Sequence, residues 1–149
     1  MDKALKDQIV SIIDDTDDMT IATIRADGYP QATTVSYMNN GLRIYFGTSA
    51  DSQKARNIER SDKVSLTINR PYENWSEIVG LSVGGKASRV TDDKEYENVV
   101  QLMFEKFPQI PDYAPMDDSV ELALFRIDPV VISLLDYRQG FGHTELVSF

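Results

Sequence analysis

The chain has 149 residues, of which 42% are hydrophobic, and this is enough for one globular domain with one core. Its formal net charge of −9 argues against a nucleic-acid partner, because no basic cluster is dense enough to offset it. The sequence contains no cysteine, which excludes disulfides, thiol catalysis and zinc–thiolate sites.

Metal binding and membrane association are not expected either. The one histidine, His143, leaves any metal site to carboxylates, and the aspartates at 14, 15, 17 and 18 lack the loop pattern of a calcium motif. We interpret these aspartates as the solvated end of a helix. No N-terminal apolar run has the length of a signal peptide or a membrane span, so we expect a cytoplasmic protein.

Hydrophobic periodicity in the first half of the chain predicts an opening helix, three strands, a second helix and a further strand. The opening helix, of about four turns, has an apolar face made by Leu5, Ile9, Ile12 and Ile13. Asp27-Gly28 and residues 39–41 are tight-turn signals between strands. The predicted strands are residues 19–25, 31–38 and 42–46 and, after a helix at 52–60, residues 64–68.

The second half of the chain predicts two more strands and one more helix. A strand at 78–90 contains Gly80, Gly84 and Gly85, which indicate a bulge or a sharp bend. Asp92, with Glu95 three residues later, begins a helix, and its apolar face is made by Tyr96, Val99, Val100, Met103 and Phe107. After an irregular loop broken by Pro108, Pro111 and Pro115, residues 120–135 form a strand that is interrupted at Asp128-Pro129.

Strands joined by hairpins, with helices inserted between them, do not follow a βαβ alternation. This order predicts a mainly β protein with an antiparallel sheet curled into a barrel and helices at the barrel ends. We expect residues 1–149 to form one domain.

The segment from Leu42 to Ile58 carries the strongest functional signal. A strand runs into Gly47, Thr48 and Ser49, and a helix opened by Asp51 or Ser52 then carries Lys54 in its first turn. Helix N-terminal amides, hydroxyls and an ammonium group form an anion site whose natural occupant is a phosphorylated cofactor. An ordinary Ser or Asp N-cap explains the same residues, so both interpretations stay open at this point.

Five segments in order resemble a known family. They are TIATIRADGYPQATTVSY at 20–37, IYFGTS at 44–49, KARNI at 54–58, DKVSL at 62–66 and GKASRVTD at 85–92. Together they resemble the pyridoxamine 5′-phosphate oxidase-like proteins, whose fold is an FMN-binding split barrel. No one segment is specific, and the ordered combination carries the resemblance.

The resemblance implies a homodimer with FMN in clefts between the subunits. It places the FMN phosphate against Thr48, Ser49, Ser52 and Lys54. It places the flavin ring along Thr33, Thr34, Val35 and Ser36, which without the resemblance are ordinary β-forming residues. Two aromatic residues, Trp75 and Tyr137, are candidates to close over a flavin, Tyr137 together with the turn at 140–142. Aromatic residues in such positions often pack at interfaces instead.

Three departures from the family pattern weaken the expected phosphate site. The flavin-contacting strand of the pyridoxamine phosphate oxidases carries an Arg and a Lys where this chain has Ala32 and Tyr37. The residue before the helix lysine is Arg in those enzymes and Gln53 here. We therefore expect no site for a second phosphate and no synthesis of pyridoxal phosphate.

The expected function is that of a flavoprotein, an FMN-dependent oxidoreductase or flavin carrier acting on an unidentified small molecule at the dimer cleft. We assign no catalytic residue, because FMN supplies the redox chemistry. A nicotinamide donor would have to reach the exposed ring face, since the sequence has no Gly-rich dinucleotide fingerprint. One alternative is a non-catalytic binding or sensing module on the same barrel, which holds flavin, a deazaflavin or haem. A haem ligand would be His143, a Met or a Tyr. The other alternative is a structural dimer with an empty cleft.

Overall fold

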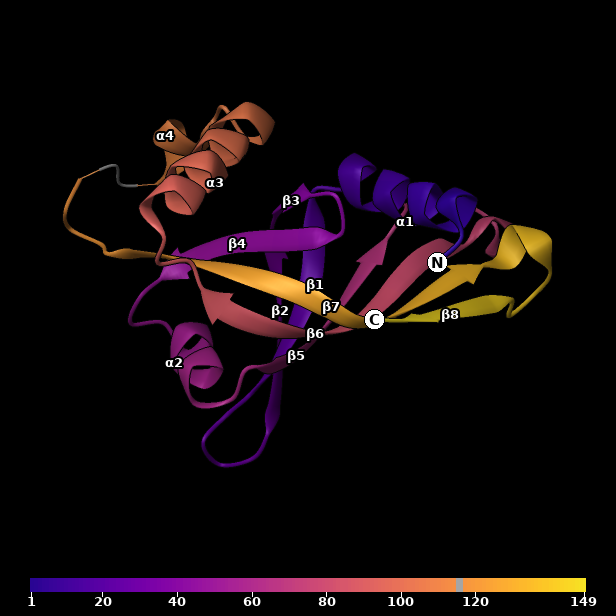
Figure 1. Ribbon diagram of the computed structural model, residues 1–149, viewed down its shortest axis with the longest axis horizontal. Helices are drawn as coiled ribbons and strands as arrows, with labels where there is room; N and C mark the ends of the chain where they lie inside the picture. The colour runs from indigo at the N-terminus through magenta and orange to yellow at the C-terminus, as the bar shows by residue number, and fades with distance from the viewer. Residues whose placement is uncertain (115–116) are drawn as a thin grey trace.

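The computed structural model describes residues 1–114 and 117–149 (Figure 1). In this part of the chain, eight strands form one antiparallel sheet: β1 (Asp18–Ile24), β2 (Pro30–Ser36), β3 (Met38–Asn40), β4 (Arg43–Ser49), β5 (Lys63–Asn69), β6 (Val79–Arg89), β7 (Leu122–Asp136) and β8 (Thr144–Ser148). The helices are α1 (Lys3–Asp15), α2 (Gln53–Arg60), α3 (Asp93–Lys106) and α4 (Ile110–Tyr113), with 3₁₀ turns at Trp75–Glu77 and Tyr137–Gln139.

The sheet closes on itself through one continuous segment of the chain, residues 30–40. The strand order is β2-β1-β5-β6-β7-β4-β3, with β8 added to β7. Because β2 pairs with β1 and β3 pairs with β4, the two ends of the sheet are joined at Tyr37, between β2 and β3. The predicted fold class, a mainly antiparallel split barrel with a few helices, is confirmed.

Alternating side chains fill the barrel. On β5, for example, Val64, Leu66 and Ile68 are buried while the residues between them are exposed. Helix α1 contacts β5 and β6, and α2 contacts β1, β4 and β6. Figure 1 shows these two helices at opposite ends of the barrel, so the expected position is confirmed for α1 and α2, whereas α3 packs on the outer face of the sheet.

The predicted bulge lies in the pairing of β6 with β7. Gly84 pairs with Val131 and Gly85 pairs with Pro129, so Val130 has no partner on β6. A Cβ atom on Gly85 would lie 2.9 Å from the Asp128 carbonyl oxygen, which is why the backbones can approach only at a glycine. The expected interruption at Asp128-Pro129 is wrong, because β7 continues through both residues and the bulge absorbs the proline.

Other local predictions need correction. Residues 39 and 40 belong to β3, and the turn is formed by Gly41, whose φ is +60°, together with Leu42. The C-terminal residues 144–148 form β8, which sequence patterning did not predict. A short helix, α4, occupies part of the proline-broken loop, and Pro115 lies outside the described residues.

Tyr45 alternates along β4 with the core residues Ile44 and Phe46, so it points to the other face of the sheet, and it is nevertheless buried. A second apolar cluster explains this, because α3 covers the outer face of β3, β4 and β7. Asp92 caps α3 as predicted, accepting the Glu95 N–H at 2.9 Å, but the Glu95 side chain turns to Tyr45 instead of completing a capping box.

None of the helices in the described ranges has the length and apolar character needed to cross a membrane.

A buried carboxylate, Asp136, joins α1 to the end of β7. Its oxygens accept hydrogen bonds from Gln8 Nε2 at 3.0 Å, Gln139 Nε2 at 3.1 Å and Arg138 Nε at 2.7 Å. The Arg138 guanidinium, together with these amides, holds the pKa of Asp136 well below its usual range.

We expect Asp136→Asn to lower the free energy of unfolding by about 2 kcal/mol at neutral pH, because charge-assisted hydrogen bonds are lost. The pKa of the Asp136 carboxyl group is lower in the folded state than in the unfolded state. Its stabilising effect is therefore complete at pH values above the unfolded-state pKa, and it is lost as pH falls through the folded-state pKa. Urea unfolding should therefore show the difference between wild type and variant shrinking as pH falls below about 4. Asp27→Asn, which breaks an exposed ion pair, is the control, and an equal effect of both variants would contradict this role.

Candidate cofactor site

The predicted phosphate-binding residues meet where β4 ends and α2 begins. Ser52 is the N-cap of α2, and its hydroxyl oxygen accepts the Ala55 N–H at 3.1 Å. The Thr48 hydroxyl donates to the same oxygen at 3.1 Å. Ser52 therefore does act as a helix cap, and its own hydroxyl hydrogen remains available to a ligand.

Lys54 stands in the first turn of α2 without a counter-charge. Its side chain is half-buried, and the loss of water lowers the pKa of its ammonium group. Within residues 1–114 and 117–149, no carboxylate oxygen lies within 4.0 Å of Lys54 Nζ. A partly desolvated cation at a helix N-terminus favours an anionic ligand, because both the charge and the helix dipole would be compensated.

Ser49 is less available than the sequence suggested. Its hydroxyl donates to the carboxylate of Asp51, and this hydrogen bond lowers the pKa of Asp51. The small hollow beside Ser49, about 160 Å³, is also lined by Asp51 and Glu121. Sequence analysis considered Asp51 only as a possible cap and missed that its charge opposes a phosphate on this side of the loop.

The four predicted residues of β2 do not share one face. Thr33 lies opposite Ile21 and Val35 opposite Met19, so both point to the buried side of the sheet. Thr34 and Ser36 point outward, as the period of a strand requires.

The hydroxyls on the two faces of β2 differ in their partners. On the outer face the Thr34 hydroxyl lies 3.4 Å from that of Thr20, and the Ser36 hydroxyl donates to Asp18 at 3.3 Å. On the inner face Thr33 Oγ1 is buried and has no hydrogen-bond partner within the described residues. An unpaired buried hydroxyl is costly, so this atom marks a place for a polar group of a ligand.

A buried amide network holds α2 against β1 and β2. Asn57 Nδ2 donates to Thr23 Oγ1 at 3.0 Å and to Gln31 Oε1 at 3.1 Å, and Gln53 Nε2 donates to Asn57 Oδ1 at 2.8 Å. This network sets the position of Lys54, one turn before Asn57, relative to β2. Sequence analysis missed it, although an asparagine beside Ile58 on the buried side of a short helix was a usable signal.

Trp75 and Tyr137 come together at the other end of the molecule. Both pack on Phe141, with ring centroids 6.2 Å and 5.3 Å apart respectively, and we call these three residues the aromatic cluster. Trp75 is 68% exposed and Phe141 is 78% exposed.

Strand β6 separates the aromatic cluster from α2. It begins at Val79, beside Asp136, and ends at Arg89, whose guanidinium lies 3.7 Å from Glu59 of α2. At about 3.3 Å per residue this strand spans roughly 33 Å. The aromatic cluster and Lys54 of one protomer therefore do not form one site, and Figure 1 shows α2 at the opposite end of the molecule from the connection between β7 and β8.

Comparisons with known proteins agree with the fold described above. General stress protein 26 of Bacillus subtilis (strain 168) is 24% identical over 136 residues, which cover 89% of each chain. A haem-binding protein from Mycobacterium smegmatis superposes with a TM-score of 0.82 at 18% identity, over 99% of this chain and 59% of its own. HutZ, the haem storage protein of Vibrio cholerae, gives a TM-score of 0.70 at 23% identity, over 84% and 89%.

These structural similarities establish the shared fold, while the sequence establishes the family. The family model described as pyridoxamine 5′-phosphate oxidase matches residues 5–135, which is most of the chain and includes every segment that suggested the resemblance. With its antiparallel barrel closed through residues 30–40, the chain belongs to the pyridoxamine 5′-phosphate oxidase family.

Proposed function

We propose that the protein binds FMN, with the phosphate at the start of α2 and the ring along β2, and that it works as an oxidoreductase or a flavin carrier. The observation that carries this proposal is Lys54, a half-buried ammonium group at a helix N-terminus with no carboxylate near it among the described residues. A phosphate ester is the ligand that such a position fits best.

The residues present fit FMN at two places. At the phosphate end, Lys54 supplies a cation, and the hydroxyls of Thr48 and Ser52 stand beside it. At the ring end, the buried Thr33 hydroxyl lacks a partner that a polar ring edge would provide. Because β2 is at an edge of the hydrogen-bonded ladder, its outward N–H and C=O groups are also available to the ring.

Each residue then has a role in holding the cofactor. Lys54 neutralises phosphate charge, Ser52 both caps α2 and donates to the ligand, and Thr33 orients the ring. When bound, FMN supplies reversible one- and two-electron transfer, and the protein supplies position and electrostatics. The electron donor and the small-molecule substrate would meet at the ring face that the protein leaves open, and a nicotinamide is a candidate donor there.

We also propose that the protein is a homodimer in which the aromatic cluster of one protomer covers the flavin of its partner. Within one protomer the cluster lies roughly a whole strand length from Lys54. Its exposed rings, Trp75 and Phe141, are large apolar surfaces that a partner subunit would cover. In this arrangement Trp75 and Tyr137 complete a site that the single chain leaves open.

Haem binding is the second candidate, and one atom favours it. His143 Nε2 is buried without a hydrogen bond within the described residues, and the nearest carboxylate oxygen, on Glu145, is 3.9 Å away. An imidazole nitrogen in that state is able to ligate iron. His143 follows the turn that carries Phe141, so the aromatic cluster lies close to it.

Absorption spectroscopy of the purified protein, followed by titration with FMN and with haem, separates the two candidates. We expect flavin bands, or saturable FMN binding at one per subunit. A Soret band that His143→Ala abolishes would replace FMN by haem as the cofactor. Absence of both chromophores and of FMN binding would contradict the proposed function and leave the fold unaffected.

We expect Lys54→Ala to weaken FMN binding by roughly 1.5–3 kcal/mol, because one charge-assisted contact is lost. Isothermal titration calorimetry or flavin fluorescence measures this change. Lys63→Ala, an exposed lysine on β5, is the matched control and should bind FMN as wild type does. Equal FMN affinity in the two variants would contradict the assignment of Lys54 to the FMN phosphate.

Thr33→Val tests the ring end of the site. Because the variant deletes a buried hydroxyl that has no described partner, the cofactor-free protein should keep its stability or gain up to about 1 kcal/mol, while FMN binding weakens. Thr34→Val, on the outer face of the same strand, should leave FMN binding unchanged. Urea unfolding and FMN titration of both variants measure the two effects, and loss of stability without loss of affinity would make Thr33 a structural residue.

A further inference from the structure

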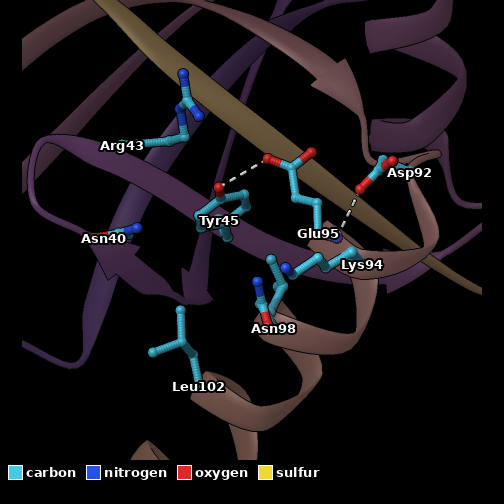
Figure 2. Close-up of a pocket in the computed structure, with 9 residues that line it drawn as sticks. Asn40, Arg43, Tyr45, Asp92, Lys94, Glu95, Asn98 and Leu102 are labelled. Carbon is cyan, nitrogen blue, oxygen red and sulfur yellow. Dashed lines mark hydrogen bonds between the residues drawn. The ribbon is translucent and has the colours of Figure 1, made fainter.

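A second concave site lies between α3 and the β3–β4 hairpin, away from the residues of the candidate cofactor site. It is a pocket of about 280 Å³ that Asn40, Tyr45, Lys94, Asn98 and Leu102 help to line (Figure 2). Tyr45 points to the outer face of β4, because Ile44 and Phe46 beside it belong to the barrel core. Thr48 of the phosphate site is on the opposite face, so the two sites are independent.

The carboxylates around this pocket are already satisfied. Glu95 accepts the Tyr45 hydroxyl at 3.0 Å and Arg126 Nη1 at 2.8 Å. Asp92 accepts the Glu95 N–H. Asp128, beside the pocket, accepts Arg43 Nε at 2.7 Å. Glu95 is therefore paired with Arg126 and Asp128 with Arg43, whereas Asp92 keeps its charge at the N-terminus of α3.

The donors that line the pocket are not satisfied in the same way. Figure 2 shows the Lys94 ammonium and the Asn98 amide reaching from α3 toward the space that Asn40 and Tyr45 face. In the described ranges no carboxylate oxygen lies within 4.0 Å of Lys94 Nζ, and the neighbouring Glu95 is paired with Arg126. Amide groups beside an ammonium are a donor set for a planar oxyanion.

A second lysine lies along the same surface. A neighbouring hollow of about 470 Å³ shares Asn40 and Arg43 with the pocket and adds Lys6. Arg43 is paired with Asp128, whereas Lys6 and Lys94 have no ion pair within the described residues. An unpaired ammonium group attracts small anions from solution.

The other wall of the pocket is apolar. Val99 and Leu102 of α3 line it, and the Tyr45 ring stands opposite (Figure 2). The pocket volume of about 280 Å³ is just below the usual range for small-molecule sites and therefore suits a ligand of few atoms. Its occupant must combine one anionic head with a short hydrocarbon body.

We propose that this pocket binds a small monocarboxylate. The carboxylate accepts hydrogen bonds from Lys94, Asn98 and Asn40, and the alkyl body packs on Leu102, Val99 and the Tyr45 ring. The assignment does not depend on FMN, because it uses none of the residues at the start of α2 or on β2.

Titration of the ¹⁵N-labelled full chain with sodium butyrate, followed by two-dimensional ¹H–¹⁵N NMR, tests the proposal. The side-chain amide signals of Asn40 and Asn98 should shift saturably, and sodium chloride at equal ionic strength should not reproduce the shifts. Lys94→Gln should raise the dissociation constant roughly tenfold or more, since a charge-assisted contact is lost. Lys86→Gln, an exposed lysine on β6, is the matched control and should not change it.

Three results would overturn the assignment. Equal shifts with butan-1-ol would make the pocket an apolar surface patch, and equal affinity for inorganic phosphate would make it an unselective anion site. An unchanged dissociation constant in Lys94→Gln would remove the recognition element itself. Because Lys94 is exposed on a helix, this variant should fold as wild type does, which its unshifted remaining spectrum would verify.

Discussion

Barrel closure at Tyr37 is the constraint on which the rest of the structure depends. Its backbone N–H donates to the Asp17 carbonyl oxygen at 3.2 Å, and its hydroxyl donates to the Ile13 carbonyl oxygen at 2.6 Å. Burial raises the pKa of Tyr37, so the hydroxyl stays a donor at any physiological pH. Lys106 of α3 places its ammonium 4.0 Å from the ring centroid and donates to the Thr16 carbonyl oxygen. One side chain thus joins α1, α3 and both ends of the sheet.

Closure at this point also decides where a cofactor can be held. Since residues 30–40 pair with β1 first and with β4 afterwards, β2 keeps one edge free along its length. The same closure puts the end of β4, and therefore the start of α2, at the opposite barrel end from α1. Asn57 then connects α2 to Gln31 of β2 through a part-buried hydrogen bond and to Thr23 of β1 through a buried one. A ligand anchored at Lys54 is thereby positioned along β2.

The distribution of charge follows a consistent physical pattern. The chain is acidic overall, yet several of its carboxylates are engaged by specific partners, as Glu95 and Asp136 show. Lys54 and Lys94, in contrast, have no ion pair within the described residues. In a chain that is acidic overall, these two unpaired ammonium groups mark two places where an anionic ligand is favoured. One lies at a helix start inside the fold and the other on the outer face of β4.

Local sequence patterns determined the elements of this protein, because periodicity, caps and turns act within a few residues. The alternation of Val64, Leu66 and Ile68, the glycines of β6 and the cap at Ser52 were all predictable on that basis. The ordered motifs also determined the family. The hydroxyl and ammonium groups at 48–54 were predictable as a cluster, since a strand that runs into a helix keeps them adjacent.

Tertiary structure decided what depends on contacts between distant segments. Tyr45 is buried because α3, some fifty residues later, covers its face. β8 forms because β7 offers it an edge beyond β4, which no local pattern reveals. Sheet register decides that Thr33 and Thr34 point to opposite faces of β2. The length of β6 sets the distance between the aromatic cluster and Lys54. Sequence therefore determined which residue types were present for a cofactor, and packing decided which of them face a common site.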